Sequence, residues 1–213
     1  MGGLSMIEMY RTGGGCMHLI LIVLCLGTAI IIERSYFLYY KYNINGSKLF
    51  QQLRQMVIKG DIHRAIGLCD DSPLPAILKA GLRQYMNKKD GVLSAMEEAA
   101  LEVTPKIQKR THYLVVLANI ATLLGLLGTI LGLILAFQAI YGAEPGEKAT
   151  QLAKGISMAM NTTAFGLAVA IPFLICNSIL QSKTNNLLDE IDEYSIKSAH
   201  LLETTDHSRK DAA

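Results

Sequence analysis

Two long uncharged stretches carry small and hydroxyl-bearing residues at helical spacing. At about 100° per residue, one face of the stretch 111–143 contains only small side chains: Ala118, Thr122, Gly125, Thr129, Gly132 and Ala136. In the stretch 155–182, the same period groups Ala159, Thr163, Gly166, Ala170 and Asn177. Such faces either let two helices approach closely or line a wet lumen with hydroxyl groups. The sequence favours the lumen, because close packing explains the glycines better than the polar members.

Enzyme chemistry finds no support in the sequence. We find no nucleophile paired with a base, no phosphate-binding loop and no metal-ligand spacing. The four cysteines have neither CxxC nor Cys/His spacing: Cys16, Cys25, Cys69 and Cys176. We therefore expect no catalysis, no metal, no cofactor and no nucleic-acid binding.

The elements that must position the small faces are transmembrane helices. Hydrophobic residues make up 51% of the 213 residues, and the uncharged runs 12–32, 111–143 and 155–182 each reach the length of a span. The first run follows Arg11, as a signal peptide would, but ends in Glu33-Arg34 rather than a small-residue cleavage site. A retained anchor is predicted. The predicted fold class is an all-α membrane protein with three transmembrane helices and a helical cytoplasmic domain.

Charge predicts the orientation. Thirteen of the twenty Lys and Arg residues lie between 33 and 112, whereas two lie between 141 and 154. Positively charged loops stay in the cytoplasm, so the N-terminus is expected outside and the C-terminus inside. The predicted segments are a periplasmic N-terminus (1–15), spans at 16–32, 113–140 and 155–180, a cytoplasmic helical loop (33–112), a periplasmic loop (141–154), and a cytoplasmic C-terminal helix with a disordered tail (181–213).

Helical stripes divide the long loop. They predict one helix that ends near Gly60, a short second helix, and a third from the breaker at 70–75 to Tyr85. A last helix is expected to start near Asp90 and to continue past Pro105 into the second span as one rod. After the third span, apolar residues among acids predict an amphipathic helix, and the polar residues 204–213 are expected to be disordered.

Several charged or aromatic residues near the first span have more than one interpretation. Glu33 and Arg34 would pair with each other or anchor the headgroup region, and a role in gating or assembly is the alternative. His18 is expected at the membrane interface rather than in a proton relay. The tyrosine-rich segment 36–42 is typical of an interfacial belt. The cluster of Lys106, Lys109 and Arg110 is expected to meet anionic lipid.

Three motifs in order resemble those of the MotA/TolQ/ExbB proton-channel family. They are Glu33-Arg34 after the first span, Gly-Leu-Leu-Gly-Thr-Ile-Leu-Gly at 125–132, and Thr-Ala-Phe-Gly-Leu-Ala-Val-Ala-Ile-Pro at 163–172. Their order and topology agree with the family from about Cys16 to Asp192. Three spans resemble the ExbB/TolQ branch more than the four-span MotA branch.

This resemblance implies a function and a set of site residues. The implied function is the proton-channel or stator subunit of a bacterial inner-membrane motor, in which a pentameric ring encloses helices of an ExbD/TolR-like single-span partner. That partner supplies a membrane aspartate, since all three spans of this chain lack charged residues. Thr129 and Thr163 match the family's pore threonines. We assign Thr122, Thr162 and Asn177 to the same pathway, and the packing around it to Gly125, Gly128, Gly132, Ala159, Gly166, Ala170 and Pro172.

One position departs from the family pattern. ExbB and TolQ place a glutamate shortly before the third-span threonine, where this chain has Met158. The pathway would then depend still more on the partner's acid, and the driven machine stays open among TonB-type transport, Tol, gliding and related systems. A non-conducting scaffold that clamps a partner helix is the main alternative. A small-solute transporter is disfavoured, because the sequence lacks paired repeats.

Overall fold

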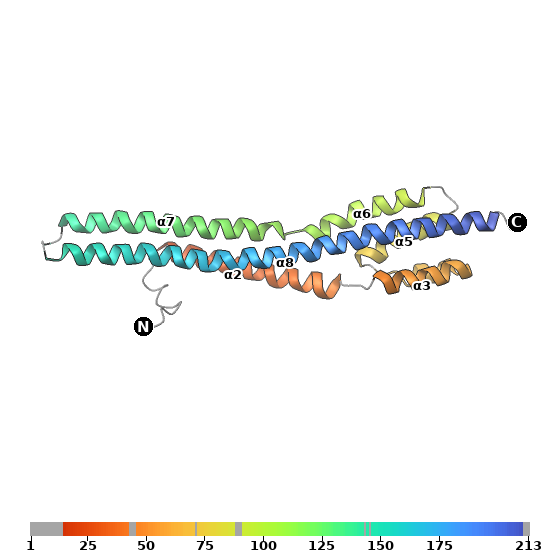
Figure 1. Cartoon of the computed structure of the whole chain (residues 1–213), viewed down its shortest axis with the longest axis horizontal. Helices are drawn as coiled ribbons and strands as arrows, with labels where there is room; N and C mark the ends of the chain where they lie inside the picture. Colours follow the sequence, from red (N-terminus) through yellow and green to blue (C-terminus); the bar gives the residue numbers. More distant parts are fainter. Residues whose placement is uncertain are drawn as a thin grey trace. The chain divides into compact units, whose positions relative to one another are not determined.

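The computed structural model describes residues 15–42, 46–70, 72–87, 91–142, 144 and 146–210, and within these ranges all regular structure is helical. Figure 1 shows the order of the elements. The helices are α2 (Cys16–Tyr36), which continues into the π-helix η1 (Phe37–Lys41), α3 (Gly46–Lys59), α4 (Ile62–Gly67), α5 (Pro73–Met86), α6 (Val92–Gln108), α7 (His112–Gly142) and α8 (Lys148–Lys210). The all-α prediction is confirmed.

The chain divides into two compact units. Unit 1 comprises Met1–Glu33 and Arg110–Ile179, and unit 2 comprises Arg34–Lys109 and Leu180–Ala213. Three helical segments are long and apolar enough to cross a membrane: Cys16–Tyr40, Val92–Tyr141 and Lys148–Thr205. Three spans were predicted from the uncharged runs, so the protein is a multi-pass membrane protein.

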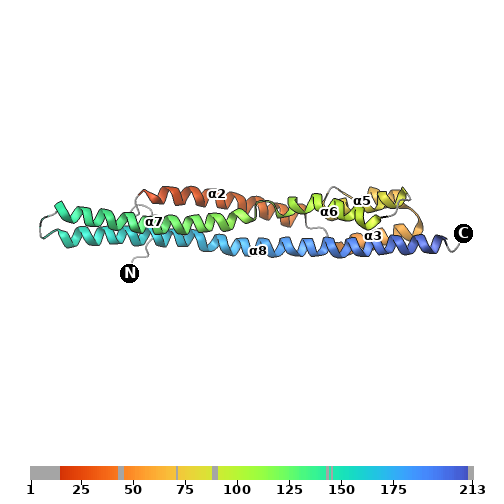
Figure 2. The same cartoon turned by 90° about the horizontal axis from the view of Figure 1, so that it is seen from above.

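Unit 1 is built on contacts among α2, α7 and α8. In both views α7 and α8 lie side by side (Figures 1 and 2). All three helices contribute buried side chains to one core. On α2, Gly27 faces the ring of Phe173, and a Cβ atom at this position would overlap that ring. A glycine is required here because the aromatic ring occupies the space of its missing side chain.

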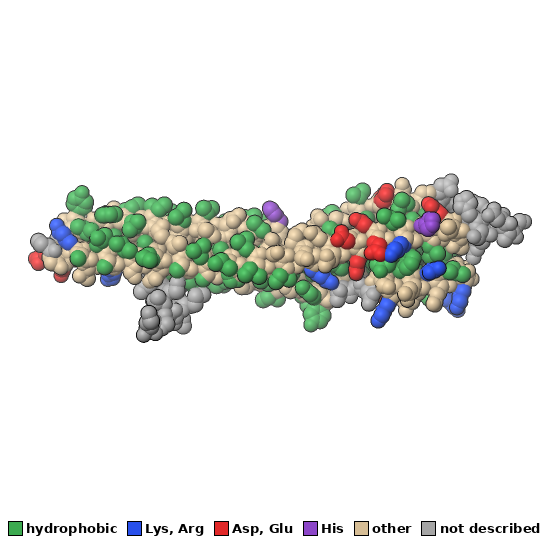
Figure 3. Space-filling view, in the orientation of Figure 1, with side chains coloured by type: hydrophobic (Ala, Val, Ile, Leu, Met, Phe, Trp, Pro, Cys, Tyr) green, Lys and Arg blue, Asp and Glu red, His purple; other side chains and the backbone are tan. Residues whose placement is uncertain are grey.

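Unit 2 holds the shorter helices and the C-terminal part of α8. The predicted stripe on α3 is confirmed, because Leu49, Leu53 and Val57 are all buried. The helix ends at Gly60, whose φ of 85° is left-handed, with Asp61 N donating to the Met56 carbonyl. On α8, Ile191 and Leu202 are buried, which confirms the predicted amphipathic face. Figure 3 shows most of the charged side chains over this part of the chain.

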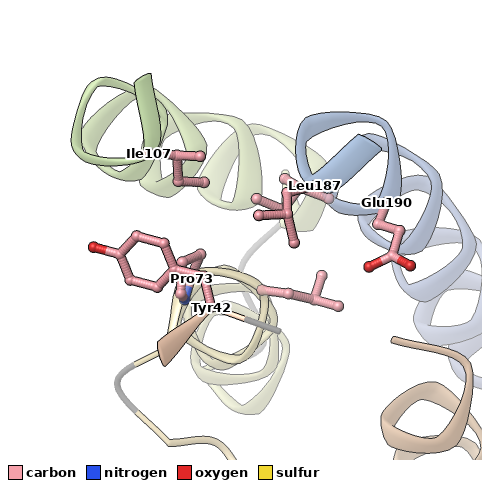
Figure 4. A pocket seen from close by; sticks show the side chains of 7 residues that line it. Tyr42, Pro73, Ile107, Leu187 and Glu190 are labelled. Carbon is pink, nitrogen blue, oxygen red and sulfur yellow. The ribbon is translucent and has the colours of Figure 1, made fainter. Parts of the chain in front are cut away.

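An apolar pocket lies inside unit 2. Figure 4 shows Tyr42, Pro73, Ile107, Leu187 and Glu190 around it. Its lining is apolar apart from the Tyr42 phenol and the Glu190 carboxylate. Convergent polar groups mark a binding or catalytic pocket, and this lining does not provide them.

The second span is not continuous with the helix that precedes it, so the predicted rod is wrong. Helix α6 passes through Pro105, as expected, but ends at Gln108, and α7 starts at His112. Between them, Lys109 is extended with a ψ of 135°, and Arg110 has a φ of 66°. A left-handed residue cannot belong to a right-handed helix, so the backbone turns here and not at the proline.

Helix α8 is longer at both ends than predicted. It begins at Lys148, inside the predicted periplasmic loop, and continues to Lys210, past the expected start of disorder at 204. The hydroxyl groups of Thr204 and Thr205 donate to the carbonyls of His200 and Leu201. These bonds satisfy the polar hydroxyls on the helix's own carbonyls one turn earlier.

The buried thiol of unit 2 is expected to resist labelling. Cys69 is 4% exposed, its Sγ donates to the Ala65 carbonyl, and burial raises the pKa of the thiol, which the Lys79 charge only partly offsets. A raised pKa leaves less of the reactive thiolate at neutral pH. In a variant whose other cysteines are replaced by serine, maleimide labelling should be slow and should accelerate with pH or denaturant. A Cys69→Ser, Asp70→Cys variant, with its thiol at an exposed position, is the fast control; equal rates would contradict the prediction.

Candidate functional site

The small faces of α7 and α8 meet each other within one chain. A Cβ atom on Gly125 would lie 3.3 Å from the Thr163 Cα and 3.5 Å from the Gly166 Cα. A Cβ atom on Gly166 would lie 2.7 Å from the Ala121 carbonyl oxygen. All three distances are to backbone atoms, so the two helix backbones are in direct contact at this level.

The same contact continues along both helices. A Cβ atom on Gly132 would lie 2.9 Å from the Ala159 Cβ, and Gly128 packs against the Thr162 side chain. Further along, Gly155 packs against Ala136, which is 2% exposed. For these glycines and alanines the close-packing interpretation is therefore the correct one within a single chain. The lumen remains a prediction for the hydroxyl groups at the edges of the contact.

Two threonines of α8 lie within this contact. The Thr163 hydroxyl donates to the Gly125 carbonyl at 3.0 Å, which links α8 to α7, and also lies 3.5 Å from the Ala159 carbonyl of its own helix. Thr162 is fully buried, and its hydroxyl donates to the Met158 carbonyl at 2.9 Å. Thr162 therefore packs against Gly128, whereas the half-buried Thr163 forms a hydrogen bond between the two helices.

The Thr163 bond predicts a modest loss of stability on substitution. Thr163→Val keeps the shape and removes the donor, so the membrane-embedded protein should lose about 0.6 to 1 kcal/mol. Thermal unfolding in detergent or a steric-trap assay would measure this change. Thr28→Val is the control, because the Thr28 hydroxyl donates only within α2, to the Leu24 and Cys25 carbonyls. A Thr163→Val protein as stable as the control would contradict the interhelical bond.

The remaining predicted pathway residues lie outside the closest contact. The half-buried Thr129 donates to the Leu126 carbonyl at 2.6 Å, and the exposed Thr122 donates to the Ala118 carbonyl at 3.1 Å. Both hydroxyls therefore keep acceptor lone pairs for another group. Asn177 is half-buried on α8. Of the five, Thr129 combines a hydroxyl, partial exposure and a position on α7 between Gly125 and Gly132, which both contact α8.

Ala170 and Pro172 occupy different environments on α8. Ala170 is 2% exposed and belongs to the core shared with α2. Pro172 is exposed within a helix that continues on both sides of it. A proline lacks the amide that would bond the carbonyl four residues earlier, so the Ala168 carbonyl loses its usual helical donor.

The sequence did not predict the partner of Glu33. The Arg110 guanidinium donates to both Glu33 carboxylate oxygens, at 2.6 and 2.7 Å. The Glu33 carboxylate is therefore engaged by Arg110, and Arg34 is buried at 3% exposed. Lys106 donates to Glu102 at 2.9 Å, which lowers the pKa of that carboxyl. Two members of the expected lipid-facing cluster thus engage carboxylates of the same chain.

The described residues contain no group of three or more His, Cys, Asp or Glu side chains that could hold a metal. The arrangement is a helical membrane protein whose uncharged spans pack through glycines and keep hydroxyl groups at the edges of the contact. This is a helical membrane protein that can offer hydroxyl groups to another helix lying against it.

The comparison with protein families gives the family. A model of the MotA/TolQ/ExbB proton channel family matches residues 70–193, which is more than half of the chain. The chain belongs to this family, and its relatives place it in the ExbB/TolQ-like branch. The matched range includes the whole α7–α8 contact and excludes Glu33.

Named relatives support this assignment. The chain is 26% identical to a putative biopolymer transport protein ExbB homolog of Methanothermobacter thermautotrophicus, over 88% of this chain and 67% of the relative. It is 30% identical to the biopolymer transport protein ExbB of Aquifex aeolicus, over 52% of this chain and 74% of the relative. It is also 30% identical to the Tol-Pal system protein TolQ of Haemophilus influenzae, over 49% of this chain and 47% of the relative.

Proposed function

We propose that this protein is the proton-channel subunit of an inner-membrane motor, which couples proton flow to mechanical work through an ExbD/TolR-like single-span partner. Family membership carries the general function, and the position of Thr129 carries the proposal for the site. The Thr129 hydroxyl is half-buried beside a backbone contact that is too close to admit another group. It is the polar atom that a helix lying against this edge would meet.

The proton-carrying acid must then come from the partner. The spans contain no Asp, Glu, Lys or Arg, and the half-buried Met158 stands where ExbB and TolQ have a glutamate. An ionised carboxylate in an apolar site costs several kcal/mol unless donors or water surround it. In the conformation of the structure, the Thr129 hydroxyl donates to the Leu126 carbonyl and can accept from the protonated acid. By rotating away from that carbonyl, the same hydroxyl can donate to the ionised acid, which suits a group that changes charge during each cycle.

A ring is the proposed assembly. A partner helix is about 10 Å wide, and the small faces of one chain are largely used by the α7–α8 contact. Several copies are therefore needed to enclose a partner, and closed rings are a common form of symmetric assembly. We propose five copies on the family resemblance, with the N-terminus periplasmic and the C-terminus cytoplasmic. Native mass spectrometry of the detergent-extracted protein should give a pentamer, and a monomer would contradict it.

Proton flux is the measurement that tests the function. The chain would be co-expressed with an ExbD/TolR-like single-span protein, and the complex reconstituted into vesicles containing a pH-sensitive dye. We expect flux that depends on the membrane potential and stops when the partner's membrane aspartate is replaced by asparagine. A complex that assembles but conducts no protons would instead support the scaffold, which the close α7–α8 packing also permits.

A further inference from the structure

The turn between α6 and α7 combines a rare backbone conformation with an ion pair to a distant part of the sequence. Arg110 is the one residue other than glycine that has a positive φ in the part of the chain that the structure describes. Its guanidinium reaches a carboxylate 77 positions earlier in the sequence, at the cytoplasmic end of α2. Both residues belong to unit 1.

The ion pair is short, and it joins two different helices. The side chains are 44% and 34% exposed, and pairs of such exposure contribute little to stability. Both oxygens accept from the same nitrogen, Arg110 Nη1, so the contact is a centred charge pair and not the two-nitrogen fork of a bidentate arginine. The pair therefore fixes the distance between the start of α7 and the end of α2.

The backbone of Arg110 gives an independent reason to assign it a role. A left-handed conformation is strained for a residue with a side chain and persists where its surroundings determine it. The turn would be relaxed by glycine, yet an arginine occupies it. Directly after it, the Tyr113 and Leu114 amides donate to the carbonyls of Arg110 and Thr111, so the first turn of α7 is built on this residue.

The consequence concerns the register of α7. Its buried Ala118 and Ala121 pack in the core shared with α2, and the same helix carries Thr129. A shift at the first turn of a rigid helix is transmitted along it.

We propose that Glu33 and Arg110 are positioning residues: their ion pair ties the start of α7 to the end of α2 and thereby holds Thr129 at the level where the partner's acid passes. This inference rests on the proposed function. It adds a residue, Glu33, that lies outside the range matched by the family model.

Three variants separate the ion pair from the strained turn. Arg110→Gly relaxes the backbone and removes the guanidinium, Arg110→Lys keeps the charge alone, and Glu33→Gln keeps the shape of the acid. Residues that act through a packed network without touching the ligand change a coupled step by about 2- to 30-fold, so proton flux per assembled complex should fall about tenfold in Arg110→Gly and Glu33→Gln, and less in Arg110→Lys. Assembly and melting temperature should stay close to those of the wild type.

The exchanged pair, Glu33→Arg with Arg110→Glu, should restore most of the flux. Arg64→Gln is the matched control, because it removes an arginine that pairs with an exposed carboxylate, Asp61, within unit 2. The inference is overturned if Arg110→Gly and Glu33→Gln conduct like the wild type. It is also overturned if the exchanged protein conducts no better than these two variants. If Arg110→Gly does not accumulate, Glu33→Gln and the exchange carry the test. Absence of flux in the wild type would instead refute the proposed function.

Discussion

Replacing Gly166 by alanine should separate the two helices at the centre of their contact. The new Cβ atom would lie 2.7 Å from the Ala121 carbonyl oxygen and 3.1 Å from the Gly125 Cα. Backbone atoms of a helix cannot move aside as a side-chain end can, so α7 and α8 must move apart. Overpacking of this kind costs about 1 to 3 kcal/mol, and the shift should also break the Thr163 bond to the Gly125 carbonyl.

The measurement is the yield and thermal stability of the extracted protein, together with the fraction assembled into rings. Gly67→Ala is the matched control: it adds the same methyl group within α4, where no atom lies within 4 Å of the new Cβ. The control should be neutral or slightly more stable, since alanine favours helix more than glycine. If Gly166→Ala behaves like Gly67→Ala, the direct backbone contact is wrong.

Replacing Thr129 by valine should abolish most proton-dependent work while the ring still assembles. The Thr129 hydroxyl bonds only its own helix, so its loss should cost little stability, whereas Thr163→Val also loses a bond between helices. A missing donor at a charge-bearing site typically costs about 2 to 4 kcal/mol in a rate. Flux should therefore fall by about 30-fold or more.

The comparison of three threonines makes this test specific. Thr28→Val should leave flux and stability unchanged, Thr163→Val should lower stability, and Thr129→Val should lower flux alone. Flux per assembled complex, measured in vesicles, separates the last two. Full activity in a stable Thr129→Val complex would mean that this hydroxyl is a packing residue and that the acid is hydrated by another group.

The sequence predicted the features that depend on local pattern. The uncharged runs predicted the spans, and the stripe of Leu49, Leu53 and Val57 predicted α3, because burial on one side of a helix leaves a periodic trace. The break at Arg110 leaves no such trace: arginine favours helices, and Pro105 offered a more obvious but incorrect place for a break.

The contacts of the candidate site residues could not be predicted from the sequence. Small residues at helical spacing predict that something approaches closely, and they do not say whether it is the next helix of the chain or a partner. In the structure, Gly125 and Gly166 lie where the next helix of the same chain approaches. The Glu33–Arg110 pair was missed for a similar reason, since contacts between residues 77 positions apart have no periodic signature.

The backbone contact between α7 and α8 also constrains how a ring built from such chains could work. Helices that touch through glycine cannot be compressed further, and closely packed interfaces change by discrete jumps rather than gradual deformation. Each α7–α8 pair would thus keep a fixed thickness throughout the cycle. In the proposed ring, a turning partner helix would move against a rigid inner surface. Little of the free energy released by each proton would then be lost in deforming the protein.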